Sequence, residues 1–160
     1  MGKELNIINN NCVTVENSEK CVTNKAFYLW KISDFSKLKG NKGEYIESEV
    51  FSSDECAIKW RLLLYPNGHM TCNLNNYVGI GLELVSAPNN KCDATCSISL
   101  VDDKKHTVLT RKSGLIPFTV NGRIGCECHY ISRKRLFNEH YRYTPGDVLR
   151  ISCKITIANK

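Results

Sequence analysis

The sequence contains no long apolar segment. No run among its 160 residues approaches the roughly 18 apolar residues that a membrane-spanning helix needs. Residues 1–11 also lack the continuous apolar segment of a secretory signal, and no Asn-x-Ser/Thr glycosylation triplet occurs anywhere. These absences predict an intracellular protein, in the nucleus or the cytoplasm, with no membrane partner.

Motifs for catalysis are also missing. The chain has no nucleophile elbow, no phosphate-binding loop and no His-Glu-x-x-His segment. Cys126-Glu127-Cys128-His129 is the most suggestive cluster, but a cysteine nucleophile needs an oriented base, which adjacency in sequence does not supply. Structural zinc needs two ligand pairs at turn spacing. The distant candidates do not form a second well-spaced pair: His69, Cys72, Cys92 and Cys96. We therefore expect no enzymatic activity, no cofactor and no bound metal.

The nine cysteines form an odd and unusually large set for a chain of this length. In a secreted domain they would suggest disulfides. Because the sequence shows no secretory signal, reduced thiols that behave as small apolar residues are expected instead.

Basic residues exceed acidic ones, which gives a formal net charge of +6. Most are scattered, apart from Arg133-Lys134-Arg135 and a loop that contains Lys37, Lys39 and Lys42. A nucleic-acid site needs cations massed on one face with stacking aromatics among them. Neither cluster has that composition, so we expect solvated loops and no nucleic-acid partner.

Short alternating segments separated by turn residues dominate the chain from Ala26 onward. Turns are indicated at 40–43, 66–68 and 87–90. One inward face is expected to carry Tyr28, Trp30 and Ile32 of a first strand. The inward residues of later strands are expected to be Val78, Ile80, Leu82 and Leu84; Cys92, Ala94, Cys96, Ile98 and Leu100; and Leu149, Ile151, Cys153, Ile155 and Ile157. In the strand that contains Val78 to Leu84, the alternate residues are expected to face outward: Tyr77, Gly79, Gly81 and Glu83.

This pattern predicts an all-β protein, an antiparallel β-sandwich of about eight strands with at most one short helix. The helix is expected at 132–137, capped by Ser132. A chain of this size fits one domain with one core. Residues 1–25 are expected to be a poorly ordered lead-in with one possible short strand at 12–15, and residues 26–158 the folded domain.

Five segments, in order, resemble the meprin and TRAF homology (MATH) domain. The first carries Tyr28, Trp30, Ile32, Phe35 and Ser36; the others are 45–52, 59–68, 77–86 and 145–157. Within that family the chain is similar to the speckle-type POZ proteins. The resemblance implies a TRAF-like sandwich that binds short linear peptides of partner proteins in a shallow groove, by strand addition. In those relatives a POZ domain follows and recruits a cullin-based ubiquitin ligase, so the MATH domain selects substrates for degradation.

The resemblance also implies where the groove lies. Its residues correspond to Gly81, Cys96, Ile116, Ile124 and Cys126, with Arg123 beside them and Gly125 retained. The aromatic residues of the relatives are absent from these positions, and the chain carries one extra residue around Cys128. Losing a central interface aromatic commonly costs about 2 kcal/mol, and about 1.4 kcal/mol is a tenfold change in affinity. We therefore expect the fold and groove location to be kept and the relatives' Ser/Thr-rich peptide preference to be lost.

Two questions stay open at this stage. Alternation places Cys96 inside with Ile98 and Leu100, whereas the resemblance places it at the groove. The sequence stops at Lys160, so a cullin-linked role would require a longer form with a POZ domain. An alternative is a structural, self-associating TRAF-like domain without peptide binding. That alternative would need heptads before the domain, and Met1–Lys25 has none.

Overall fold

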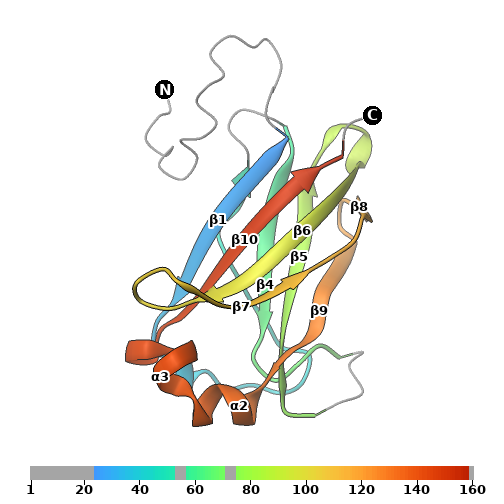
Figure 1. Ribbon diagram of the computed structural model, residues 1–160. Helices are drawn as coiled ribbons and strands as arrows, with labels where there is room; N and C mark the ends of the chain where they lie inside the picture. The colour runs from blue at the N-terminus through green and yellow to red at the C-terminus, as the bar shows by residue number, and fades with distance from the viewer. Residues whose placement is uncertain (1–23, 53–56, 71–74, 159–160) are drawn as a thin grey trace.

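Two antiparallel sheets packed face to face make up the computed structural model, which describes residues 24–52, 57–70 and 75–158, with the backbone alone at 123–129 (Figure 1). Sheet A runs in the order β1 (Lys25–Ile32), β10 (Leu149–Ile157) and β6 (Lys91–Val101), with β7 (Thr107–Lys112) and β8 (Ile116–Thr119) both along the outer side of β6. Sheet B contains β2 (Ile46–Glu47) and β3 (Phe51–Ser52) beside β4 (Lys59–Tyr65), then β5 (Tyr77–Ser86) and β9 (Arg123–Ser132). The predicted all-β sandwich is confirmed.

In the part of the chain that the structure describes, the sandwich has ten strands, because one edge strand in each sheet is broken into two. β2 and β3 pair with successive parts of β4, and β8 and β7 with successive parts of β6. At each break a serine hydroxyl accepts a backbone N–H from the continuous strand. Ser48 Oγ accepts from Leu62 N, and Ser113 Oγ accepts from Cys96 N, both at 2.9 Å. The eight strands expected from sequence thus correspond to eight positions, two of them interrupted.

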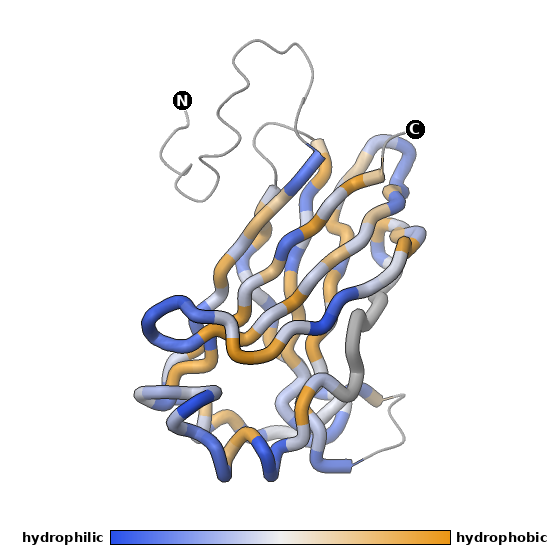
Figure 2. The backbone as a smooth tube through the Cα atoms, in the orientation of Figure 1, coloured by the Kyte–Doolittle hydropathy of each residue, from blue (hydrophilic) through white to orange (hydrophobic). Residues whose placement is uncertain are grey.

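The core lies between the sheets and follows the predicted alternation. The inward residues predicted for β5, β6 and β10 are all buried except Ile157, which is half-buried against the core. Ile32 of β1 is buried too, whereas Tyr28 and Trp30 are only half-buried, because β1 is the end strand of sheet A. Orange and blue segments alternate along these strands in Figure 2.

Aromatic contacts join the two sheets. Tyr28 of β1 stacks on Phe51 of β3, with ring centroids 4.7 Å apart. Trp60 of β4, which is fully buried, meets Phe118 of β8 edge-on at 5.0 Å. Since Phe51 and Leu84 flank Trp60 in register, these rings form one apolar row across the width of the sandwich. Such pairs add about 0.5–1.5 kcal/mol each beyond their burial.

The α-helices of the described residues lie between β9 and β10. Ser132 caps α2 (Arg133–Asn138) as predicted, accepting a hydrogen bond from Arg135 N, and Leu136 packs into the core. The expectation of at most one short helix was wrong, because a second helix, α3 (His140–Tyr143), follows α2 directly and buries Tyr143. Short 3-10 turns in the described ranges are η2 (Phe35–Lys37), η3 (Pro88–Asn90) and η4 (Pro145–Asp147).

The cysteines that the structure describes behave as predicted. Cys92, Cys96 and Cys153 are buried thiols in the core. Burial raises the pKa of the Cys153 thiol well above its usual value of 9.0, and the neighbouring Cys96 raises it further. The remaining cysteines and the predicted strand at 12–15 lie outside the residues whose side chains are described.

Replacing Cys153 with valine should reduce the alkaline instability of the domain. Below pH 9 the thiol is protonated in both states; above it, the unfolded chain loses the proton while the folded chain keeps it. The free energy of unfolding must then fall with rising pH, by up to about 1.4 kcal/mol per pH unit for one proton. Urea titrations between pH 8 and 10.5 should show a shallower fall for Cys153→Val than for the wild type. Thr156→Val, on the outer face of the same strand, should keep the wild-type slope; equal slopes in all three proteins would contradict this account.

Candidate functional site

The predicted groove positions lie along one lateral edge of the sandwich. β9 ends sheet B, and β7 and β8 end sheet A, on the same side of the molecule (Figure 1). Two contacts tie these edges at one end. Tyr130 of β9 donates its hydroxyl to Ile98 O at 2.7 Å, and Arg111 of β7 donates to Tyr130 O at 3.0 Å. The Trp60–Phe118 contact ties the sandwich at the other end.

Most of the predicted site residues fall between these two ties. Ile116 begins β8, and Cys96 lies two residues further along β6 than Ala94, the partner of Ile116. On sheet B, Leu82 pairs with Ile124, which brings Gly81 of β5 beside the 124–127 part of β9. This part of β9 contains four consecutive predicted site residues, whose side chains lie outside what the structure describes: Arg123, Ile124, Gly125 and Cys126. Chain segments far apart in sequence therefore meet at this edge, which we call the β8–β9 edge.

Cys96 lies on the inner face of β6. Its side chain is 5% exposed and belongs to the hydrophobic core, as alternation predicted. Its backbone N–H and C=O both bond to Ser113, which fastens the connection between β7 and β8 to β6. Cys96 can therefore take part in a groove only as its floor, and its role in binding stays a prediction.

The pairing of β9 with β5 is irregular at this edge. From Ile124 to Glu127, β9 uses three residue steps where β5 uses two, from Leu82 to Ile80. From Glu127 to Ile131 it uses four steps, again opposite two on β5. Bulges of this kind bend a strand and change the direction of its side chains. They fall in the region where the sequence suggested an additional residue.

The outer face of sheet B is partly buried at β5. Gly79, Gly81 and Glu83 point outward as expected, yet all three are buried. Leu63 of β4 lies opposite Gly81 and is 1% exposed. Because a glycine has no side chain, the leucine can lie against the sheet at this position. This outward face is therefore partly closed to solvent.

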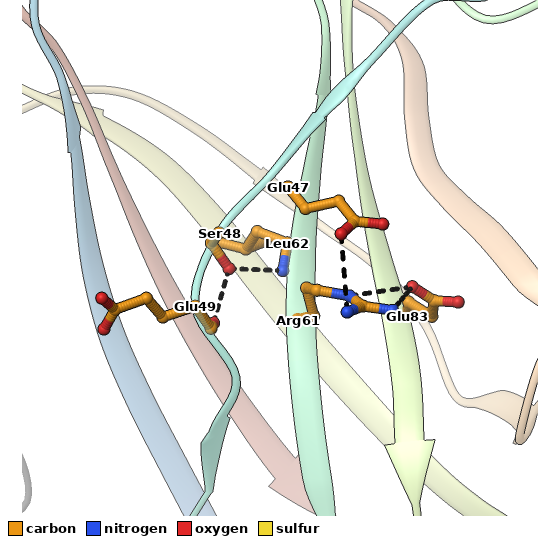
Figure 3. Close-up of polar contacts among 6 residues, drawn as sticks. All are labelled: Glu47, Ser48, Glu49, Arg61, Leu62 and Glu83. Carbon is orange, nitrogen blue, oxygen red and sulfur yellow. Dashed lines mark hydrogen bonds and ion pairs between the residues drawn. The ribbon is translucent and has the colours of Figure 1, made fainter.

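A charged network on this face begins at Glu83, the register partner of Arg123 on β9, and continues to β4 and β2 (Figure 3). Arg61 of β4 donates to Glu83 of β5 through Nη2 at 3.0 Å and through Nε at 3.2 Å. A second carboxylate, from Glu47 of β2, lies 3.5 Å from Arg61 Nη1. Sequence reasoning missed this network, although Arg61 and Glu83 stand opposite each other on adjacent strands. Two opposite charges at outward positions of neighbouring strands were the available signal.

Removing Arg61 alone should destabilise the domain more than removing the pair. Glu83 is 6% exposed, so Arg61→Met removes the two hydrogen bonds that this buried carboxylate accepts from the guanidinium, at a cost of about 2 kcal/mol. The double variant Arg61→Met/Glu83→Leu removes both charges and should recover at least half of that loss. Chemical denaturation of the two single variants and the double variant measures the coupling. Additive effects would show that the ion pair contributes nothing.

Other classes of site find little support in the described part of the chain. There, no group of three or more His, Cys, Asp or Glu side chains could hold a metal ion. The cluster at 126–129 and Cys72 fall outside the described side chains, so the expectation of no zinc stays a prediction. The helices within these residues are all too short or too polar to cross a bilayer.

Comparison with known protein families agrees with the architecture. Residues 27–155 match the model of the MATH domain, so the chain belongs to the MATH-domain family. Among solved structures it is similar to the Salmonella enterica trimeric lipoprotein SadB, at 12% sequence identity and a TM-score of 0.38. That match covers 81% of this chain and 60% of the other. MATH domains are in general protein-interaction modules.

Proposed function

We propose that this MATH domain binds short linear peptides at the β8–β9 edge, by strand addition to β9. The observation that carries the proposal is the position of β9. It pairs with β5 on one side, and among the described residues no strand pairs with it on the other. An edge strand with unpaired backbone groups is the surface to which an extended peptide adds. Family membership supports the same class of function.

The peptide preference should differ from that of the speckle-type POZ relatives. The positions that are aromatic in those proteins are Gly81, Cys96, Ile116, Ile124 and Cys126 here. Without rings at the centre of the interface, several increments of about 2 kcal/mol are lost. A micromolar interaction with an apolar-polar-Ser-Ser/Thr-Ser/Thr peptide would fall to the millimolar range or weaker.

The wider biological role is part of the same proposal. By analogy with the speckle-type POZ proteins, the domain would select substrates for a cullin-based ubiquitin ligase, in a longer form that carries a POZ domain. It would act by binding, without catalysis, inside the cell. The analogy rests on the sequence segments given above, and the family match supports the interaction module alone.

An NMR titration with two peptide pools tests both the location and the preference. One pool carries apolar-polar-Ser-Ser/Thr-Ser/Thr cores, and the other is random. We expect shifts on β5, β8 and β9 around Gly81 and Ile124 with members of the random pool, and none with the Ser/Thr pool. Shifts in those residues with the Ser/Thr pool would overturn the proposed change of preference. If neither pool changes the chemical shifts of these residues, the proposal of peptide binding at this edge is wrong.

A charge placed at Ile116 should abolish binding of any peptide found in that titration. Ile116 is half-buried at the start of β8, against the core. Ile116→Glu should weaken binding at least tenfold, because a carboxylate would replace apolar surface at the edge. Thr119→Glu is the matched control: Thr119 lies on the same strand, points to the opposite face and is exposed. Equal losses in both variants would place the peptide elsewhere.

A further inference from the structure

The outer face of sheet A gathers cations that are scattered in the sequence. Strand register places Lys31 opposite Arg150, and Phe27 opposite Lys154. The row that begins with Phe27 and Lys154 continues through Ser97 of β6 to Lys112 of β7. Between this row and the Lys31–Arg150 pair lies a row with three hydroxyls, from Ser152, Ser99 and Thr110. We call the following set the basic face: Lys25, Phe27, Leu29 and Lys31; Arg150, Ser152, Lys154 and Thr156; Thr95, Ser97 and Ser99; Thr110 and Lys112.

This face carries five cations and no carboxylate. Lys31, Lys112 and Lys154 are exposed and make no ion pair with the described residues. Acidic residues lie at its borders. Asp93 belongs to the same outward row of β6 as Thr95, Asp34 and Asp147 lie just beyond the Lys31 and Arg150 end, and Asp102 and Asp103 lie in the β6–β7 hairpin. Asp102 accepts hydrogen bonds from the backbone N–H groups of Lys104 and His106.

Two further features suggest a ligand instead of a solvated face. Lys31 and Arg150 are like charges directly opposite each other on neighbouring strands, an arrangement that destabilises a sheet. Arg150 donates through Nη1 to Pro145 O and Val148 O at 3.4 Å, and an anion above the sheet could bind its remaining donors together with Lys31. Phe27 and Leu29 are half-buried, yet neither packs against the hydrophobic core. The face therefore combines cations with a small apolar strip along β1, and it is turned toward the viewer in Figure 1.

We propose that the basic face binds an extended acidic peptide segment with carboxylates at positions i and i+4 and an apolar residue at i+2. Arg150 and Lys154 are four residues apart on one strand, which is about 13 Å, and an extended peptide spaces its residues equally. The row between them contains Leu29 and Ser152, so the middle residue of the peptide meets apolar surface. This binding is independent of the proposed peptide site at the β8–β9 edge.

The composition of the face favours a peptide over a nucleic acid. Single-stranded nucleic acids bind through several aromatic side chains on which successive bases stack. The basic face has one aromatic residue, Phe27, on the end strand. Its other side chains are hydroxyls, four lysines, Arg150 and Leu29, which suit the carboxylates, peptide groups and one apolar residue of a peptide.

Fluorescence anisotropy with a labelled nine-residue peptide that contains Glu-Ala-Leu-Ala-Glu tests the proposal. We expect saturable binding that weakens steeply with salt, and at least a tenfold loss for Lys154→Glu and for Lys31→Glu. Lys134→Glu is the matched control, since Lys134 is an exposed lysine on α2, outside this face. A comparable loss of affinity in Lys134→Glu would show that binding depends only on the net charge of the protein, and would contradict a site on the basic face.

The same assay separates the other outcomes. A scrambled peptide of identical charge should bind several-fold more weakly, and equal binding would overturn the i, i+4 spacing. A single-stranded oligonucleotide that competes more strongly than the peptide would replace the proposal with a nucleic-acid site. Ile116→Glu, which should abolish binding at the β8–β9 edge, should leave acidic-peptide binding unchanged. Failure at one site therefore does not count against the other.

Discussion

Burial of Trp60 between the two sheets is the constraint on which the rest of the fold depends. Its side chain has no exposed surface, and it contacts Phe118 of the opposite sheet while standing in register with Phe51 and Leu84. Stacking of Tyr28 on Phe51 continues this row to the first strand. Because side chains alternate along a strand, fixing one inward residue fixes the direction of every other residue on that strand. The aromatic row therefore sets the register from which both outer faces follow.

The two broken edges show how a sandwich can change direction without leaving backbone groups unsatisfied. Ser48 and Ser113 each offer a hydroxyl oxygen to an N–H group of the neighbouring continuous strand. Each Oγ also donates to the carbonyl of the residue that follows it, Glu49 or Gly114, at 2.8 Å. A hydroxyl that both accepts and donates can replace a missing ladder contact. One of these breaks lies beside the β8–β9 edge, where β7 turns into β8.

Sequence reasoning predicted inward faces well and outer faces poorly, for a physical reason. Apolar alternation identified Val78 to Leu84 and Leu149 to Ile155 because burial in the core depends mainly on the residue itself. Burial of Glu83 depends instead on Arg61 and Leu63, which are about twenty residues away in sequence and adjacent only after pairing. The second helix was missed because its N-cap residue, Glu139, makes no side-chain capping hydrogen bond, so the sequence carries no helix-start signal there. Groove positions depended on family resemblance, since no local pattern marks an edge strand as a binding surface.

Register set by the core also explains how a costly surface arrangement persists. Ile32 and Leu149 are buried partners, as are Ala26 and Ile155, so the pairing of β1 with β10 cannot shift by one residue without exposing both strands' apolar faces. Lys31 must then stand opposite Arg150. Substitution of either residue would remove the repulsion without touching the core, because both side chains lie on the outer face. The acidic peptide proposed for this face would relieve the repulsion while both residues stay, and the inner register would provide it with a rigid, pre-formed surface.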